Sequence, residues 1–290
     1  MTSPATTSAA VPGTKLPGTA PAVRSADGGS GGSPPRVSTA PAARSADGGS
    51  GGSPPRVSTA PAVCTAALLA ALDTVRDPEL DEPVTTLGFV SSCSVSPDGA
   101  AQVHLRLPTY FCAPNFAFLM VADAYDAVAA LPGVRRAVVV LDEHFASDAI
   151  NGGVAAHAGF ARSFDGEAVG ELHELRADFL RKAVMAGTDQ VCRPLLASGT
   201  DPDRLPALTL GEVPESPALQ RLRERRAELG LPDGDDSLLL IDPQTGAGVR
   251  PGGLRMHLGR ARLTRTSLEA NGSICRGMLQ HRYGMGEEDQ

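Results

Sequence analysis

The chain of 290 residues is long enough for one or two globular domains, which typically take about 100 to 200 residues each. Its 33 acidic residues outnumber its 26 basic ones, and the excess lies entirely after position 62, where acidic residues exceed basic ones by ten. Such a body repels phosphate backbones, and with no Trp and three Tyr it has few side chains for base stacking, so nucleic-acid binding is not expected.

Hydropathy and cysteine usage indicate a cytoplasmic protein without a membrane span. The first residues lack the basic segment and apolar run of a signal peptide. The most apolar stretch, 116–134, is interrupted by Asp123, Asp126 and Pro132, whereas a span needs about 20 mainly apolar residues. The five cysteines are widely spaced without a C-x-x-C pair, which is typical of reduced thiols rather than of a secreted disulfide framework.

Residues 1–62 are rich in Pro, Gly and Ser and contain a 20-residue tandem repeat. The segment 19–38 recurs as 39–58 and differs only where Ala43 replaces Val23. Each unit has almost no large apolar side chain, so burial cannot offset the entropy lost on ordering. The composition therefore predicts a disordered leader.

A first helix is predicted just after Val63. Leu68, Leu72 and Val75 fall at i, i+4 and i+7, with Leu69 beside them, which gives one apolar stripe. Pro78 limits this helix on its C-terminal side.

Four further elements follow in chain order. Residues 89–95 and 101–107 alternate between apolar and polar like strands, and Pro97-Asp98-Gly99 supplies the turn between them. Residues 114–131 have apolar positions at helical spacing, and 134–141 is rich in β-branched residues like a strand. The order helix, strand, strand, helix, strand predicts an α+β two-layer sandwich over 63–164, with helices on one face of a mainly antiparallel sheet.

Residues 165–290 are predicted to form a mainly helical extension of unknown fold. A helix is expected over 167–186, followed by a proline-dotted loop to Glu215. Ser216 and Pro217 are suited to the N-cap and first position of a helix that reaches Leu229. Its charged run RLRERRAE is expected to be a solvated face.

The last predicted helix, 254–283, is basic. Seven Arg and only one acidic residue, Glu269, lie between Arg250 and Arg282. The net charge of this segment is thus opposite to that of the rest of the chain after position 62. The segment could be a docking face for a partner, or it could pair with the acidic domain of the same chain.

Three motifs lie at the junctions between the elements of the first domain: DPEL at 77–80, LGFV at 87–90 and PTYFCAP at 108–114. Together with the element order they resemble the SufT/PaaD-like iron-sulfur cluster assembly family over about residues 63–160. Two positions depart from the family pattern, since Ala113 separates Cys112 from Pro114 and Phe145 stands where many relatives have Trp. The resemblance implies a site for the cluster or the client protein, made by the residues Asp77, Glu79, Thr109 and Cys112.

Cys112 is the expected metal ligand. A cysteine just before a helix N-terminus is a candidate thiolate, because the helix dipole stabilises negative charge, and thiolates bind soft metals and iron-sulfur species. The alternative is that Cys112 is a small buried hydrophobic residue, as most free cysteines are. Asp77 likewise has the alternative role of capping a turn.

The other cysteines and the histidines carry weaker hypotheses. Cys93 is in phase with the buried face of its strand, and Cys64 is assigned no role. Cys192 and Cys275 are not expected to join Cys112, because no spacing supports a ligand set. An enzyme hypothesis needs Cys112, His144 and Asp142 to form a triad, for which no motif exists.

The resemblance implies a non-catalytic assembly or maturation factor for an iron-sulfur or other iron-dependent client protein. By analogy with relatives that operate beside multicomponent oxygenases, the client would be an oxygenase component. The cofactor would be an iron-sulfur cluster or iron held only transiently. The alternative function is that of a metal-free scaffold protein, and the third is that of a cysteine-dependent enzyme. Whether the chain forms a homo-oligomer is left open.

Overall fold

The computed structural model describes residues 63–166, 168 and 170–284. The leader expected over 1–62 lies outside the described residues. So does Glu167, at which the first helix of the extension was expected to begin.

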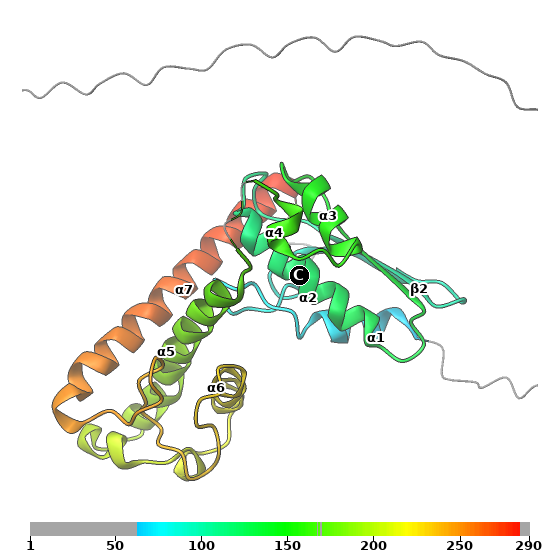
Figure 1. Ribbon diagram of the computed structural model, residues 1–290. Coiled ribbons are helices and arrows are strands. Elements are labelled where there is room, and N and C mark those ends of the chain that lie inside the picture. Colours follow the sequence, from blue (N-terminus) through cyan, green and yellow to red (C-terminus); the bar gives the residue numbers. More distant parts are fainter. Residues whose placement is uncertain (1–62, 167, 169, 285–290) are drawn as a thin grey trace, which may run out of the picture. The chain divides into compact units, whose positions relative to one another are not determined.

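The first domain has the element order that its sequence predicts (Figure 1). The elements are α1 Thr65–Leu72, β1 Val90–Val95, β2 Ala100–Leu105, α2 Pro114–Ala129 and β3 Arg136–Leu141. The predicted α+β class is therefore confirmed. Each strand is one or two residues shorter than predicted, because the flanking residues belong to the adjoining loops.

The sheet has the order β1-β2-β3, with β1 antiparallel to β2 but β2 parallel to β3. The expectation of a mainly antiparallel sheet is thus wrong for one of its two strand pairs. The physical reason is the helix α2, which carries the chain back along the sheet before β3 starts, as a crossover does between parallel strands. The predicted turn between β1 and β2 is present, with Gly99 at a φ of +83°.

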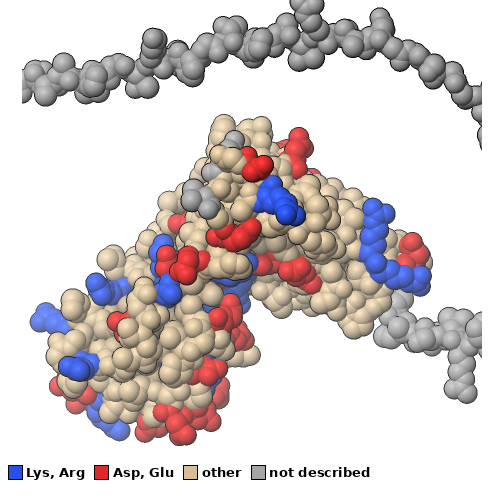
Figure 2. Space-filling view, viewed as in Figure 1, with Lys and Arg blue, Asp and Glu red and all other residues tan. Residues whose placement is uncertain are grey.

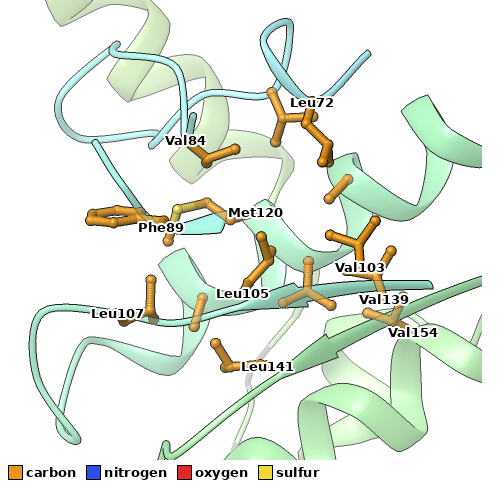
Figure 3. Packing of buried hydrophobic residues seen from close by; sticks show 14 of the residues in the cluster. Leu72, Val84, Phe89, Val103, Leu105, Leu107, Met120, Val139, Leu141 and Val154 are labelled. Atoms are coloured by element: carbon orange, nitrogen blue, oxygen red, sulfur yellow. The ribbon is translucent and has the colours of Figure 1, made fainter. Parts of the chain in front are cut away.

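The core of this domain lies between the helices and one face of the sheet. Figure 3 shows Leu72 and Met120 facing strand residues that include Val103 and Val139. On β2, the alternating side chains of Val103 and Leu105 are buried whereas His104 between them is half-buried. Full burial of such an apolar side chain contributes about 1.5 to 3 kcal/mol. Leu69 departs from the expected stripe, because it is exposed.

Two short helices, α3 Ser147–Ala155 and α4 Phe160–Ser163, follow β3. Helix α3 packs against both α2 and β3. Asn151 of α3 accepts a hydrogen bond from the Leu141 N–H (2.8 Å) and donates one to the Leu141 carbonyl (3.1 Å). The helix is thereby attached to the outer edge of the sheet.

The extension consists of α5 His173–Ala197, α6 Pro217–Glu228 and α7 Leu254–Tyr283, joined by loops with the short 3-10 helices Pro202–Ala207, Leu210–Glu212 and Pro251–Gly253. Helices α5 and α7 lie along each other (Figure 1). Within the described ranges, none of the helices combines the length and apolar character that crossing a membrane requires.

The bounds of α5 differ from the expectation, whereas the start of α6 and the predicted helix 254–283 are confirmed. Helix α5 does not end near Ala186 but continues to Ala197, because Val191 and Cys192 are buried in a second core and Pro194 is accommodated in its last turn. The start of α6 is as predicted, since the Ser216 hydroxyl accepts a hydrogen bond from the Leu219 N–H at 3.2 Å.

The charged run of α6 is a solvated face only in part, since Glu224 and Glu228 are exposed. Arg226 is fully buried and donates to the backbone carbonyls of Leu238 (2.9 Å) and Leu239, and Arg225 is 7% exposed. Loop carbonyls and carboxylates replace part of the water around these two guanidinium groups, a compensation that the sequence does not display. Arg225 Nη2 and Arg226 Nε have no hydrogen-bond partner among the described residues.

The basic helix α7 divides into paired and exposed arginines. Arg265, Arg276 and Arg282 form ion pairs with Asp189, Glu82 and Glu143, respectively. Arg255, Arg260 and Arg262 are exposed. In the view of Figure 2, side chains of both signs are interspersed over the extension. Intramolecular pairing therefore accounts for part of the sign reversal along this helix.

Candidate functional site

The motif PTYFCAP forms the loop from the end of β2 to the start of α2. Cys112 is half-buried there, and its Sγ lies 3.3 Å from the Thr109 Oγ1. The same Thr109 oxygen accepts a hydrogen bond from the Phe111 N–H at 3.2 Å. Thr109 and Cys112, two of the predicted site residues, are thus in direct contact. A threonine hydroxyl can donate to a thiolate, so this contact suits a sulfur that acquires negative charge.

The start of α2 offers the Cys112 thiol fewer free backbone N–H groups than a bare helix N-terminus would. Pro114 occupies the first helical position and has no N–H. The Phe116 N–H is engaged by the Ala113 carbonyl at 3.0 Å and by the Asn115 Oδ1 at 3.0 Å. The described polar partner of the Cys112 sulfur is therefore Thr109, and stabilisation of a thiolate by the helix stays a prediction.

An aromatic cluster, formed by Tyr110, Phe111 and Phe145, lies beside Cys112. Ring centroids are 5.1 Å apart between Tyr110 and Phe111 and 6.1 Å apart between Phe111 and Phe145. Phe111 is 77% exposed and Phe145 is 50% exposed. Large aromatic side chains gathered in solvent are uncommon unless they contact a partner. The sequence analysis noted Phe145 only as a departure from a Trp and did not single out its neighbours.

His144 holds the loop of Cys112 in place through backbone contacts. Its Nδ1 accepts from the Ala146 N–H at 3.2 Å, so the proton is on Nε2, which donates to the Cys112 carbonyl at 2.7 Å. Burial, opposed in part by this hydrogen bond, lowers the pKa of His144 below its usual value. Both ring nitrogens are engaged by the backbone, so the neutral imidazole is the form that fits these contacts.

The triad of the enzyme hypothesis is not assembled. The His144 ring contacts the Cys112 carbonyl rather than its sulfur. The Asp142 carboxylate instead contacts the Nδ1 of His104 at 3.0 Å. A base for the thiol would have to come from another group.

Asp77 is buried and organises the DPEL turn. Its Oδ1 accepts hydrogen bonds from the N–H groups of Glu79 (2.9 Å) and Leu80 (2.8 Å). Burial raises the pKa of Asp77 from 3.8 to about 6, against the effect of these two hydrogen bonds. Asp77 thus has the turn-capping role that was its alternative reading. Glu79 is half-buried in the same turn.

The residues after this turn are held by the extension. Asp81 adopts a φ of +55° and accepts a hydrogen bond from the Arg225 Nε of α6 at 2.7 Å. The next residue, Glu82, is paired with Arg276 of α7 at 2.6 Å. Both pairs are at least partly shielded from water, which strengthens them relative to surface pairs. Helices α6 and α7 therefore fix the loop that carries a family motif.

Cys275 of α7 belongs to the surroundings of the predicted site. It is half-buried and packs against the same core as Cys112. Burial, followed by the nearby Asp77, Cys112 and Glu79, raises the pKa of Cys275 to about 11. Cys275 thus contacts the core of the first domain although it belongs to the extension.

Cys192 is 1% exposed and belongs to the second core, whereas Cys112 and Cys275 pack against the first. Cys275 lies four residues before Leu279, on the side of α7 that packs against the first core. Across the residues that the structure describes, no group of three or more His, Cys, Asp or Glu side chains is arranged to hold a metal ion.

Cavities lie both near this region and beyond it. A small one, of about 110 Å³, is lined by Asp77 and Asp81 together with Arg176 and Arg225. A larger one, of about 740 Å³, lies between α5, α7 and the loop 242–249, and none of the predicted site residues line it.

Comparison with known proteins confirms the resemblance of the first domain. Residues 65–139 match the family model described as iron-sulfur cluster assembly protein, and this range contains all four predicted site residues. Proteins named iron-sulfur cluster carrier protein from Mycobacterium bovis and Mycobacterium tuberculosis are 38% identical over 77 residues. That match covers 27% of this chain but only 20% of each relative. No solved structure matches the chain.

Proposed function

We propose that this chain is an assembly or maturation factor that carries an iron-sulfur cluster, or iron, to an iron-dependent client protein. The observation that carries the proposal is a half-buried thiol beside an exposed aromatic cluster, within and next to the segment that matches the assembly family. The thiol would hold the cargo and the aromatic cluster would contact the client. The matched relatives are named as carriers, which supports delivery rather than storage.

The surroundings of Cys112 fit a sulfur ligand that must also let its cargo go. Iron-sulfur clusters are held by cysteine thiolates, and a cysteine at a loop is accessible to an acceptor in a way that a buried one is not. The Thr109 hydroxyl, 3.3 Å from the sulfur, can donate to the thiolate that remains after the cargo has left. Thr109 would therefore assist release, not binding.

The client surface that we propose is the aromatic cluster of Tyr110, Phe111 and Phe145. Aromatic residues are enriched at the centres of protein interfaces, where each contributes much contact area at little entropic cost. Their position beside Cys112 would bring the acceptor protein against the cargo. The client itself would be an iron-dependent enzyme, and an oxygenase component is our proposal for it.

We propose further that the chain performs no turnover and works in the cytoplasm. The backbone contacts of both His144 ring nitrogens support the first point, since they engage the base that a thiol enzyme would need. The five cysteines are free, which supports a reducing compartment. A His144→Gln variant with an unchanged capacity to bind and transfer cargo would agree with a purely structural histidine.

The test is anaerobic reconstitution with ferrous iron and sulfide, followed by visible absorption and by the amount of bound iron. The unaltered chain should gain sulfide-to-iron absorption, and Cys112→Ser should lose most of it. Cys64→Ser is the matched control, because Cys64 is exposed at the start of α1. Transfer to the apo form of a [2Fe-2S] ferredoxin would then be followed by circular dichroism, and Phe111→Ser should slow it.

The same experiment distinguishes a cargo carrier from a metal-free scaffold protein. If neither the chain nor its variants bind iron, cargo carriage is wrong and a metal-free scaffold is the better account. A scaffold would still use the aromatic cluster, so client binding that depends on Phe111 without any bound iron would support it.

A further inference from the structure

The cavity of about 740 Å³ is lined by residues of the extension alone, from α5, α7 and the loop before α7. Its volume lies within the range of about 300 to 1,000 Å³ that is typical of small-molecule sites. The family match ends at residue 139, so it does not include this cavity. The cargo site proposed around Cys112 does not account for the cavity either, because Cys112 does not line it.

Apolar side chains from three segments line much of the cavity: Leu175, Phe179 and Met185 of α5, Val249 of the loop and Met256 of α7. Met256 is 67% exposed, and its flexible thioether side chain can adapt to the shape of a bound molecule. The Lys182 Nζ lies 4.9 Å from the centre of the Phe179 ring. A cation therefore adjoins the apolar wall of the cavity.

The charged side chains that line the cavity leave an excess of positive charge. Arg181, Lys182 and Arg260 are the cations, and Asp178 and Asp242 are the carboxylates. Arg181 is paired with Asp178 at 2.7 Å. Within the part of the chain that the structure describes, neither Lys182 nor Arg260 forms an ion pair. One negative charge on a bound molecule would balance the excess.

The remaining polar groups of the cavity do not supply that negative charge. The Asp242 Oδ1 already accepts hydrogen bonds from the N–H groups of Gln244 at 2.7 Å and Thr245 at 3.3 Å. Burial lowers the pKa of His257 below its usual value, so the imidazole is neutral at neutral pH. The chain after position 62 is acidic by ten, which makes this local positive excess an exception.

We propose that this cavity binds a small monoanion with an apolar body, of the class of medium-chain carboxylates. Lys182 of α5 and Arg260 of α7 would contact the anionic group, and the apolar body would cover Met256 and its apolar neighbours. The excess of one positive charge fits one carboxylate better than the several carboxylates of an acidic helix. This inference goes beyond the proposed function, because it concerns a second site that takes no cargo.

The first test is a fluorescence titration of the full chain with dansyl-labelled undecanoic acid at neutral pH. Fluorescence should rise and saturate at one probe molecule per chain, because the dye leaves water for an apolar site. Decanoate should displace the probe at concentrations about tenfold lower than decanol or decyltrimethylammonium, all below micelle formation. Equal displacement by the alcohol or the cation would show that the site does not select anions and would overturn the proposal.

The second test identifies the cations. Lys182→Gln and Arg260→Gln should each weaken decanoate binding by about fivefold or more, since each removes a charged donor from the cavity. Arg193→Gln is the matched control, because Arg193 is exposed on α5 and does not line the cavity. Unfolding midpoints in urea show that the variants are folded. Unchanged binding in both cavity variants would mean that the anion binds elsewhere.

Two further arms separate this cavity from other binding surfaces. Phe111→Ser alters the exposed aromatic cluster and should leave the decanoate-sensitive fluorescence unchanged, whereas loss of that signal would assign the anion to the cluster. A synthetic amphipathic helix, with Leu on one face and Glu on the other, should compete less well than decanoate. If the peptide competes better, the occupant is a protein segment and the proposal is wrong.

Discussion

The two regions of the molecule bury charged side chains in different surroundings. In the extension, the Arg226 guanidinium is fully buried and bonded to loop carbonyls. In the first domain, Asp77 is 8% exposed, and its described hydrogen bonds, from two N–H groups of one turn, all go to the same oxygen. The comparison indicates that Arg226 is a structural group, whereas Asp77 retains a carboxylate that can change its charge near neutral pH.

The largest effect is expected for Arg226→Ala. The substitution leaves the carbonyls of Leu238 and Leu239 without a donor and opens a cavity, so the free energy of unfolding should fall by about 3 to 5 kcal/mol. Urea unfolding measures this difference. Arg223→Ala is the control, because Arg223 pairs with an Asp235 that is 81% exposed, and it should cost about 1 kcal/mol or less. Similar losses in both variants would contradict the structural role of Arg226.

Leu279→Ala should have the next largest effect, and it tests whether the regions depend on each other. Loss of this buried side chain should lower the free energy of unfolding by about 2 to 4 kcal/mol. Amide hydrogen exchange should also rise in the last turns of α7. Leu263→Ala on the same helix is the control, since Leu263 is 71% exposed and should change stability by about 0.5 kcal/mol at most. Exchange that stays unchanged would show that α7 docks without Leu279.

Asp77→Asn should stabilise the protein in a pH-dependent way. The pKa of Asp77 is raised from 3.8 to about 6 in the folded state, so between these values the unfolded chain loses its proton first. The wild-type free energy of unfolding therefore falls as the pH rises from about 4 to about 6, by up to about 3 kcal/mol, and stays lower above it. Asn keeps the acceptor for the Glu79 and Leu80 N–H groups and cannot ionise.

The measurement is the urea midpoint of wild type and Asp77→Asn at several pH values. The two proteins should be similar near pH 4, and the variant should be more stable at pH 7. An equal difference at both pH values would mean that the pKa of Asp77 is the same in the folded and the unfolded chain, and would contradict the effect of burial.

The smallest effect on stability is expected for Phe111→Ser. Because Phe111 is 77% exposed, the free energy of unfolding should change by about 0.5 kcal/mol at most. Binding of a hydrophobic dye such as ANS should nevertheless fall, since the aromatic cluster loses its most exposed member. Unchanged dye binding would mean that another apolar surface dominates.

The sequence predicted those parts of the fold that depend on local pattern. Alternation identified β2 and its turn at Gly99, and the Ser216 cap located the start of α6, because these signals arise from neighbouring residues. The segment after Ala186 was predicted to be a proline-dotted loop, although burial of Val191 and Cys192 keeps α5 helical through Pro194. The parallel pairing of β3 depends on the path of α2, which no local pattern contains.

In the candidate site, too, the sequence predicted contacts within one loop but not contacts between distant segments. Thr109 and Cys112 are three residues apart and were correctly expected to be together, since one loop places both. Cys275 is 163 positions from Cys112, and its packing against the same core follows only from the docking of α7. The run around Arg226 was read as solvated because its acceptors are carbonyls of another segment. Contacts between residues far apart in the chain do not produce a periodic pattern in the sequence.

The hydrogen bonds of Asn151 have a consequence for association between molecules. β3 is an edge strand, and the exposed backbone groups of such an edge can recruit a strand from another chain and start aggregation. At Leu141 both outward groups are occupied by one side-chain amide, so an incoming strand finds neither donor nor acceptor there. Helix α3 thus protects the end of the sheet from intermolecular strand addition. Loss of the helix would leave the Leu141 N–H and carbonyl free to pair with a strand of another molecule.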